Sequence, residues 1–188
     1  MIKKRTTENC ITAWNNLKAN AYRWHSGLNK DAERSISRMF YQSVFDTLNN
    51  KTGFSTSPGA KSTWEGMVDD HYMAPQTVAK FVMENPELIN DYKKFQEIFL
   101  FCCKTIVVTK EENAKLAQIT KKQPVLTKDK YHYLGIKLYH GYEELPTMNQ
   151  VLDVPKTFTE WESKFIKNDY RPTVVYTESK PNLDKFFE

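Results

Sequence analysis

Residues 64–76, WEGMVDDHYMAPQ, place two aspartates and a histidine next to one another, with a proline four residues after the histidine. Asp69, Asp70 and His71 therefore combine carboxylates, which bind divalent cations, with an imidazole, which moves protons near neutral pH. No other segment of the chain gathers as many groups of this kind. The flanking sequence has the pattern of a helical scaffold, so we expect this segment to organise both the fold and the chemistry.

Length and composition are those of one small globular domain. A chain of 188 residues is long enough to bury a hydrophobic core without disulfide or metal cross-links. Helical periodicity dominates, so we expect an α+β fold: a mainly helical single domain with a few short β-strands. Aromatic residues make up 13% of the chain, a share that serves a core or a binding surface equally well.

Cysteine usage and hydropathy favour an intracellular protein. Cys10, Cys102 and Cys103 are odd in number and include an adjacent pair, which does not suit disulfide bonds. No CxxC spacing is present, which disfavours a zinc site built from cysteines. No apolar stretch approaches the roughly 20 residues of a membrane span, and no secretory signal peptide is recognisable. We expect a cytoplasmic protein, without membrane association, whose thiols are reduced and buried.

Basic charge is concentrated in the first third of the chain. Residues 1–64 contain ten Lys and Arg against four Asp and Glu, a net charge of +6, whereas residues 65–188 have a net charge of −2. A basic segment favours contact with a polyanion, and nucleic acid is the first candidate. Ordinary surface solubility accounts for a charge of this size equally well.

Two amphipathic helices are expected in the basic segment. Apolar residues recur at helical spacing over 8–24 and again over 31–49. Arg23 lies on the polar side of the first helix, and Arg34 and Arg38 lie one turn apart on the exposed side of the second. Such a pair forms either a plain helical hairpin against the core, which we favour, or a helix-turn-helix reader of DNA.

A polar segment rich in Asn, Gly, Ser, Thr and Pro separates the basic helices from the rest of the chain. Residues 49–63 are either a linker or a long functional loop, and we favour a loop that leads into the Asp-Asp-His segment. The expected organisation is a basic helical hairpin over 1–49, a helical core with short strands over 50–178, and a tail over 179–188. The candidate site belongs to the core.

Local signals in the second half predict a strand that is followed directly by a helix. Residues 104–108 are short and β-branched, as in a buried strand. Thr109 and Glu112 form a T-x-x-E capping box, which opens a helix whose first turns contain Asn113. Further helices are expected over 77–85, from Pro86 onward and over 157–168, and strands over 131–139 and 174–176.

An aspartate next to a histidine is a chemically productive pair. The carboxylate binds a divalent metal ion, while the imidazole stays off the metal and activates a water molecule as general base. Adjacent residues of a strand point to opposite faces, so Asp70 and His71 cooperate only at a bend or at a strand end. Pro75 is compatible with such an end.

The sequence VDDHYMAPQ, residues 68–76, resembles the first half of the HNH (ββα-metal) nuclease motif. In that family an Asp-His or His-His pair is followed shortly by proline, as in the Asp-His-x-x-Pro-Gln of RNA-guided CRISPR nucleases and phage-encoded endonucleases. This chain has one additional residue between His71 and Pro75. The family then closes a hairpin and takes Asn or His from the following helix. Asn113 is the matching residue here, about forty residues further along.

The resemblance implies a metal-dependent DNA endonuclease of phage or mobile-element type. His71 is then the general base that activates water, and Asp70 and Asn113 hold one Mg²⁺ or Mn²⁺ ion on the scissile phosphate. The expected partner is double-stranded DNA, whose phosphates are bound by basic side chains. These are Arg23, Arg34, Arg38, Lys51 and Lys61.

Two other classes of function are compatible with the same residues. A carboxylate ahead of a proline commonly caps the next helix, in which case the aspartates are structural. The chain is then a non-catalytic nucleic-acid-binding or regulatory protein, or a viral assembly protein whose aromatic residues serve interfaces. A nuclease needs Asp70, His71 and a third polar ligand in one cleft, whereas a binding protein needs its basic residues on one exposed face.

Overall fold

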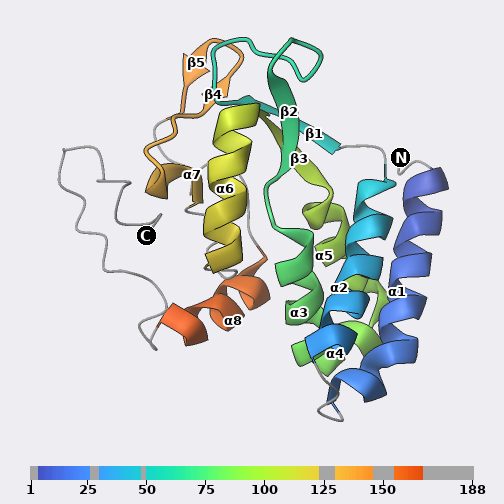
Figure 1. The fold of residues 1–188 in the computed structure, drawn as a ribbon. Helices are drawn as coiled ribbons and strands as arrows, with labels where there is room; N and C mark the ends of the chain where they lie inside the picture. The colour runs from blue at the N-terminus through green and yellow to red at the C-terminus, as the bar shows by residue number, and fades with distance from the viewer. Residues whose placement is uncertain (1–3, 26–29, 48–49, 123–129, 146–154, 167–188) are drawn as a thin grey trace. The chain divides into compact units, whose positions relative to one another are not determined.

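The computed structural model describes residues 4–25, 30–47, 50–122, 130–145 and 155–166 (Figure 1). The chain forms two compact units: unit 1 comprises Met1–Asn50 and His71–Thr105, and unit 2 comprises Lys51–Asp70 and Ile106–Glu188. The fold class is the one expected from the sequence, mainly helical α+β with a small sheet. Among the described helices, none is both long enough and apolar enough to cross a membrane.

Unit 1 consists of helices around an aromatic core. They are α1 (Lys4–His25), α2 (Lys30–Phe45), α3 (Pro75–Glu84), α4 (Pro86–Asn90) and α5 (Tyr92–Cys102). The Phe40 ring of α2 meets the Phe95 and Phe99 rings of α5 edge-on, at centroid distances of 6.3 and 6.0 Å, and all three are fully buried. The two helices expected in the basic segment are confirmed as α1 and α2, and they pack against α3–α5.

Prolines and one aspartate divide the middle of the chain into three helices. Pro75 and Pro86 stand in the first turns of α3 and α4, where a backbone N–H would have no helical acceptor. Asp91 ends α4 and caps α5, because its carboxylate accepts hydrogen bonds from Lys93 N and Lys94 N at 3.0 and 3.2 Å. The single helix expected from Pro86 onward is therefore two helices that meet at Asp91.

Unit 2 holds most of a five-stranded sheet and the helices that follow it. The strands are β1 (Asn50–Ser55), β2 (Met67–His71), β3 (Lys104–Thr109), β4 (Tyr139–His140) and β5 (Glu143–Glu144), in the order β2-β3-β1-β4-β5. The helices are α6 (Lys110–Lys122), α7 (Lys130–Tyr133) and α8 (Lys156–Ile166). β3 is the strand predicted over 104–108, and its inner position explains why Ile106 and Val108 are fully buried.

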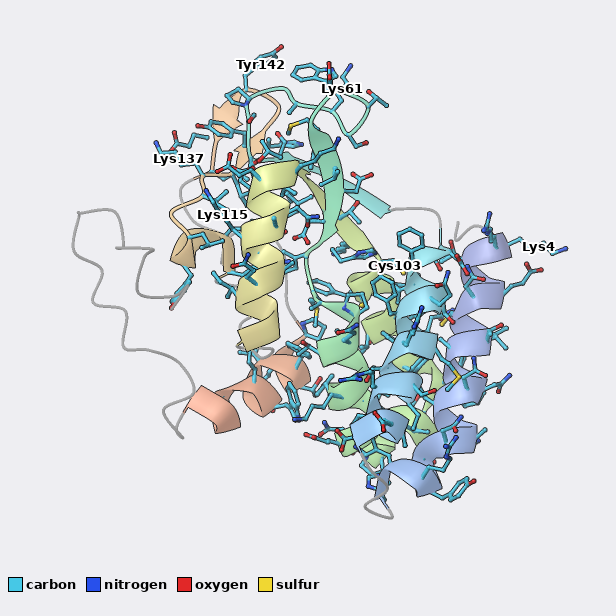
Figure 2. All side chains as sticks on the ribbon, in the orientation of Figure 1. Lys4, Lys61, Cys103, Lys115, Lys137 and Tyr142 are labelled. Carbon is cyan, nitrogen blue, oxygen red and sulfur yellow. The ribbon has the colours of Figure 1, made fainter. Side chains whose placement is uncertain are left out.

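A long loop between β1 and β2 is joined to the turn between β4 and β5. Gly59 N donates to Gly141 O at 2.6 Å, and the Tyr142 ring lies where a Cβ at Gly59 would approach to 2.8 Å. Lys61 and Tyr142 lie on these two segments (Figure 2). Gly59 has φ +67°, a conformation that glycine adopts without steric cost.

Two segments differ from the expectation. Residues 50–55, interpreted as loop, form β1, because they pair with β4, with Phe54 opposite His140. The strand expected over 131–139 is wrong for its first half, where residues 130–133 form α7, and strand structure begins at Tyr139. Burial of Tyr131 and Tyr133 on a short helix produced an alternation that resembles a strand. The expected strand at 174–176 and the tail over 179–188 lie outside the described residues.

Candidate functional site

The Asp-Asp-His segment forms the end of β2. Asp69, Asp70 and His71 are its last three residues, and each is partly buried. Adjacent residues within a strand alternate between faces, and His71 is the last residue of β2, where this alternation ends. α3 begins at Pro75, and its N-cap, Ala74, provides no side-chain cap. The interpretation of the aspartates as caps of this helix is therefore wrong.

Asp70 is held by two side chains of α7. Lys130 Nζ donates to Asp70 Oδ2 at 2.6 Å, and the Tyr131 hydroxyl donates to the same oxygen at 2.5 Å. The side chains of Lys130 and Asp70 are 3% and 16% exposed, and Tyr131 is fully buried. Water therefore screens this ion pair weakly, and each charge compensates the desolvation of the other.

Sequence reasoning misses Lys130 and Tyr131. They follow Asp70 by about sixty residues, at the start of the strand expected over 131–139. The available signal is a lysine beside an aromatic run, and no fixed spacing connects such a pair to a carboxylate. The contact depends on the tertiary fold of unit 2.

β2, β3 and α6 form a strand–strand–helix arrangement. At one end of the strand pair Tyr72 N donates to Lys104 O at 3.0 Å, and at the other end Lys110 N donates to Gly66 O at 2.9 Å. The first residue number rises as the second falls, so the strands are antiparallel. β3 continues into α6 without a loop. The helices α3–α5 are therefore an insertion between two paired strands.

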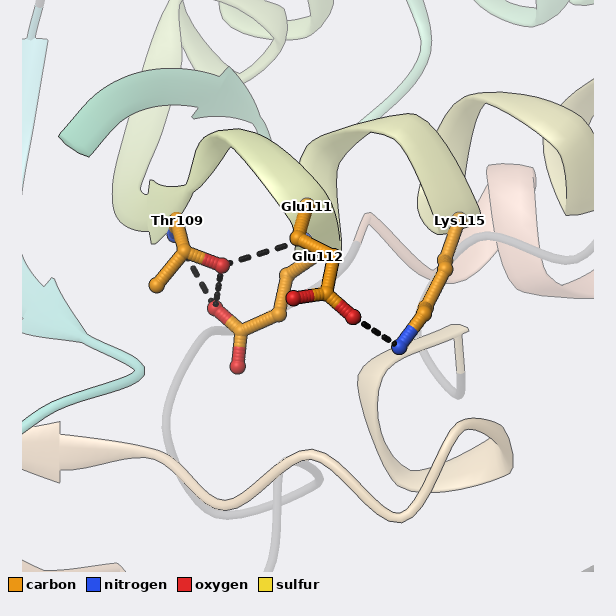
Figure 3. A network of polar contacts seen from close by, with 4 residues as sticks. All are labelled: Thr109, Glu111, Glu112 and Lys115. Atoms are coloured by element: carbon orange, nitrogen blue, oxygen red, sulfur yellow. Dashed lines mark hydrogen bonds and ion pairs between the residues drawn. The ribbon is translucent and has the colours of Figure 1, made fainter. Parts of the chain in front are cut away.

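The predicted capping box fixes the start of α6 (Figure 3). Glu112 N donates to Thr109 Oγ1 at 3.0 Å, and Thr109 N donates in return to Glu112 Oε2 at 2.9 Å. Thr56 Oγ1 donates to the same glutamate oxygen at 2.5 Å, which ties α6 to the residue after β1. Asn113, the next residue of α6, is partly buried.

The residues implied by the nuclease resemblance belong to β2 and to the helix that follows its paired strand; Asp70 and Asn113 are in unit 2, and His71 begins the second segment of unit 1. Asp70 and His71 are consecutive at the end of β2, and Asn113 stands in the helix that follows the neighbouring strand. The 41 residues between His71 and Asn113 in the sequence are largely α3–α5. Of the other motif residues, Pro75 is buried at the start of α3 and Gln76 is exposed.

The candidate ligands have the chemistry of a hard-cation site. Carboxylate and amide oxygens, such as those of Asp70 and Asn113, suit Mg²⁺ and Mn²⁺, and Mg²⁺ retains several waters when it binds proteins. Within the described residues, no group of three or more His, Cys, Asp and Glu side chains is placed to hold a metal ion. A cation at Asp70 would rely on few protein ligands, and it would meet the ammonium group of Lys130.

Three of the basic residues expected to contact phosphates lie in unit 1. Arg34 and Arg38 are exposed on α2, and Arg34 Nη1 lies 3.9 Å from Asp31 Oδ1. Arg23 is partly buried on α1, and its Nη1 donates to Asn20 Oδ1 at 3.2 Å. The exposed pair on α2 is therefore the more accessible for a polyanion.

Unit 2 presents Lys61 together with exposed aromatic rings. Lys61 is exposed in the loop between β1 and β2, and Trp64 of the same loop is 50% exposed. Tyr142, which the sequence does not single out, is 83% exposed. Lys51 belongs to β1, and its side chain lies outside the described part of the structure.

The cysteines are not candidates for catalysis. Cys10, Cys102 and Cys103 are free and buried, as expected from the sequence. Burial raises the pKa of the Cys10 thiol to about 11 and that of the Cys103 thiol to about 12. Both thiols are therefore protonated at neutral pH, and a protonated thiol is a poor nucleophile.

No family model, curated protein or solved structure matches this chain. Its function is therefore inferred from two local features. One is the strand–strand–helix arrangement that carries Asp70, His71 and Asn113. The other is the buried contact of Asp70 with Lys130 and Tyr131.

Proposed function

We propose that this protein is a metal-dependent DNA endonuclease of HNH type. The observation that carries the proposal is the antiparallel pair of β2 and β3 that leads into α6. Asp70 and His71 end the first strand, and Asn113 lies in the first turns of the helix. A strand pair followed by a helix is the ββα arrangement after which the family is named. The inserted helices α3–α5 account for the long spacing between the two halves of the motif.

His71 is the general base in the proposed reaction. Its imidazole accepts a proton from a water molecule while the water oxygen bonds to the scissile phosphorus. The bond between phosphorus and the leaving sugar oxygen then breaks, and that oxygen takes a proton from solvent. Position at a strand end suits this role, because the sheet restricts the backbone on one side while the partly buried side chain remains accessible to water.

Asp70 and Asn113 supply the oxygen ligands of the proposed site. They would hold a Mg²⁺ or Mn²⁺ ion, and such an ion would supply positive charge to stabilise a leaving oxygen. Arg34, Arg38 and Lys61 are exposed, as phosphate contacts on double-stranded DNA require. Every such contact steepens the dependence of binding on salt concentration.

Plasmid nicking in Mg²⁺ or Mn²⁺ tests the proposal. The wild type is expected to convert supercoiled plasmid to nicked circles, and His71→Ala to nick at least about 100-fold more slowly, the usual share of a general base. His25→Ala is the matched control, because His25 is exposed at the end of α1. Circular dichroism verifies the fold of each variant. A wild type without metal-dependent nicking, or an equally active His71→Ala, overturns the proposal.

A non-catalytic nucleic-acid-binding protein is the second candidate, and the Asp70–Lys130 ion pair favours it. The ammonium group neutralises the carboxylate without a metal ion, as in a purely structural pair. Duplex binding in EDTA, measured against salt for Arg34→Ala and Arg38→Ala, distinguishes this candidate. Each lost phosphate contact lowers the slope of log affinity against log salt by about 0.9. Such binding without nicking in any metal supports it.

A further inference from the structure

We propose that one exposed stripe of α2 binds an unpaired nucleic-acid strand through both its phosphates and its bases. The stripe consists of Arg34, Arg38, Tyr41 and Phe45, which follow one another at intervals of four, three and four residues. Because a helix has about 3.6 residues per turn, this spacing aligns the side chains along one face over roughly 17 Å. The inference rests on the proposed function only in taking Arg34 and Arg38 as phosphate contacts.

The stripe is on the side of α2 that faces away from the core. Ile36, Phe40 and Val44 form the buried face of the same helix, and helical periodicity places that face opposite the stripe. Phe45 is 59% exposed, and the side chain of Arg34 is 82% exposed. Packing within unit 1 therefore does not require an aromatic ring at position 45.

Tyr41 and Phe45 form an aromatic platform. Their rings are stacked, with centroids 5.9 Å apart and an angle of 20° between the ring planes. Tyr41 is partly buried, so it supports the more exposed Phe45 ring. Proteins that bind single strands stack bases on such rings, whatever the base, because every base has a flat face. The bases of a duplex already stack on one another, so the platform selects an unpaired strand.

The charge along the stripe fits a polyanion. Arg34 and Arg38 are exposed one turn apart, ahead of the aromatic pair. Asp31 lies 3.9 Å from Arg34 in an exposed ion pair, which water screens and a phosphate can replace. Asp46, beyond the end of the stripe, accepts a hydrogen bond from Gln42 Nε2 at 2.8 Å. A strand that offers phosphates to the arginines and bases to the platform matches this order of groups.

The exposed aromatic residues of unit 2 lack this combination. Tyr142 is 83% exposed, but the exposed carboxylates of Glu143 and Glu144 follow it directly. Their negative charge disfavours the approach of phosphates. Tyr142 is therefore the matched control for an exposed ring that is not expected to bind a nucleic-acid strand.

Binding of a labelled single-stranded DNA of about 12 nucleotides, measured by fluorescence anisotropy in EDTA, tests the inference. Phe45→Leu keeps an apolar side chain but removes the flat ring, so it is expected to weaken binding at least about fivefold. Phe45→Tyr keeps the ring and is expected to bind like the wild type, as is Tyr142→Ala. The matching duplex is expected to bind more weakly and to be insensitive to Phe45→Leu.

Salt dependence separates the arginines from the rings. Arg38→Ala is expected to lower the slope of log affinity against log salt by about 0.7, the share of one phosphate contact on a single strand. Phe45→Leu is expected to lower the affinity and to leave this slope unchanged, because a stacked base releases no counterions. Circular dichroism verifies the fold of each variant.

The outcomes separate the inference from the proposed function. Unchanged single-strand affinity in folded Phe45→Leu overturns the inference, while nicking that depends on His71 leaves the endonuclease standing. Ring-dependent binding of the single strand without nicking supports the inference and overturns the endonuclease. A wild type that binds no oligonucleotide also overturns the inference. Dimers in sedimentation that Phe45→Ala disrupts would then assign the stripe to contact with a second copy of the chain.

Discussion

Burial changes the acid–base chemistry of two thiols, those of Cys10 and Cys103. Burial in unit 1 raises their pKa values from an ordinary 9.0 to about 11 and about 12. The unfolded chain therefore releases these thiol protons near pH 9, whereas the folded chain retains them to higher pH. Between these values the folded state binds more protons than the unfolded state, and stability falls as the pH rises.

Urea unfolding between pH 7 and pH 10.5 is expected to show a decline in the free energy of unfolding above about pH 9. Each thiol lowers the free energy of unfolding by up to about 1.4 kcal/mol per pH unit, in the pH range where the thiol is ionised only in the unfolded chain. Cys103→Ala removes one of the two groups and is expected to give a shallower decline than the wild type. Tyrosines ionise in both proteins, so the difference isolates Cys103. Equal slopes for the two proteins would contradict the assignment.

Some residues of the candidate site can be identified from the sequence, and others cannot. Asp70 and His71 are recognisable because their chemistry lies in consecutive positions, and Asn113 because a capping box precedes it. Lys130 and Tyr131 are not recognisable, because nothing local distinguishes a lysine that pairs with a buried carboxylate from one that faces solvent. Their role follows only from the tertiary contact.

At the scale of elements, the start of α6 is the best-determined part of the site. Glu112 Oε2 accepts hydrogen bonds from Thr56 Oγ1, Thr109 N and Thr109 Oγ1. Its neighbour Glu111 points elsewhere: Lys115 Nζ lies 2.7 Å from its Oε1, and this hydrogen bond lowers the pKa of the Glu111 carboxyl (Figure 3). Consecutive glutamates in one helical turn therefore have different roles.

Glu112→Ala and Glu111→Ala form a matched pair for this element. Glu112→Ala leaves the Thr56 hydroxyl and the Thr109 N–H without their acceptor, so we expect a loss of about 2 kcal/mol in the free energy of unfolding. Glu111 is exposed, and its ion pair is screened by water, so its replacement is expected to leave the unfolding midpoint almost unchanged. Equal effects of the two substitutions in urea unfolding would show that the capping box is not an anchor.

Elements with local signals are predictable from sequence, and those that depend on distant pairing are not. β3 and α6 follow from a β-branched run and a capping box, α3 from helical periodicity, and α4 from the proline at its start. The sequence of β1 predicts a loop, because its strand conformation depends on pairing with β4, which lies far along the chain. Pairing between distant segments also explains the long spacing in the candidate motif. An insertion between two paired strands lengthens the sequence that separates them but leaves the strands paired.

At the scale of the whole molecule, the chain crosses between the two units three times. Unit 1 takes residues from Met1–Asn50 and again from His71–Thr105. The contiguous division expected from the sequence, with a hairpin over 1–49 followed by a core, does not describe this interleaving. Composition marks the polar segment after α2 but carries no information about which later helices cover α1 and α2.

Replacement of Phe40 tests how much the stability of unit 1 depends on packing between its two chain segments. Its ring joins α2 to the Phe95 and Phe99 rings of α5, so Phe40→Ala is expected to cost about 3–5 kcal/mol in the free energy of unfolding. Phe45, on the same helix, is 59% exposed, and Phe45→Ala is the matched control with little expected effect. Similar losses in both variants, measured by urea unfolding, would show that the Phe40 cavity is not the cause.

The contact between Asp70 and Lys130 has a consequence for synthesis on the ribosome. The two residues are 60 positions apart, and at about 5–20 residues per second roughly 3–12 s pass between their translation. Throughout that interval the nascent carboxylate has no ammonium partner and stays hydrated. Collapse of β2 into an apolar environment is therefore unfavourable until α7 has left the exit tunnel. A translation product that stops before residue 130 cannot assemble this site, however well its earlier helices fold.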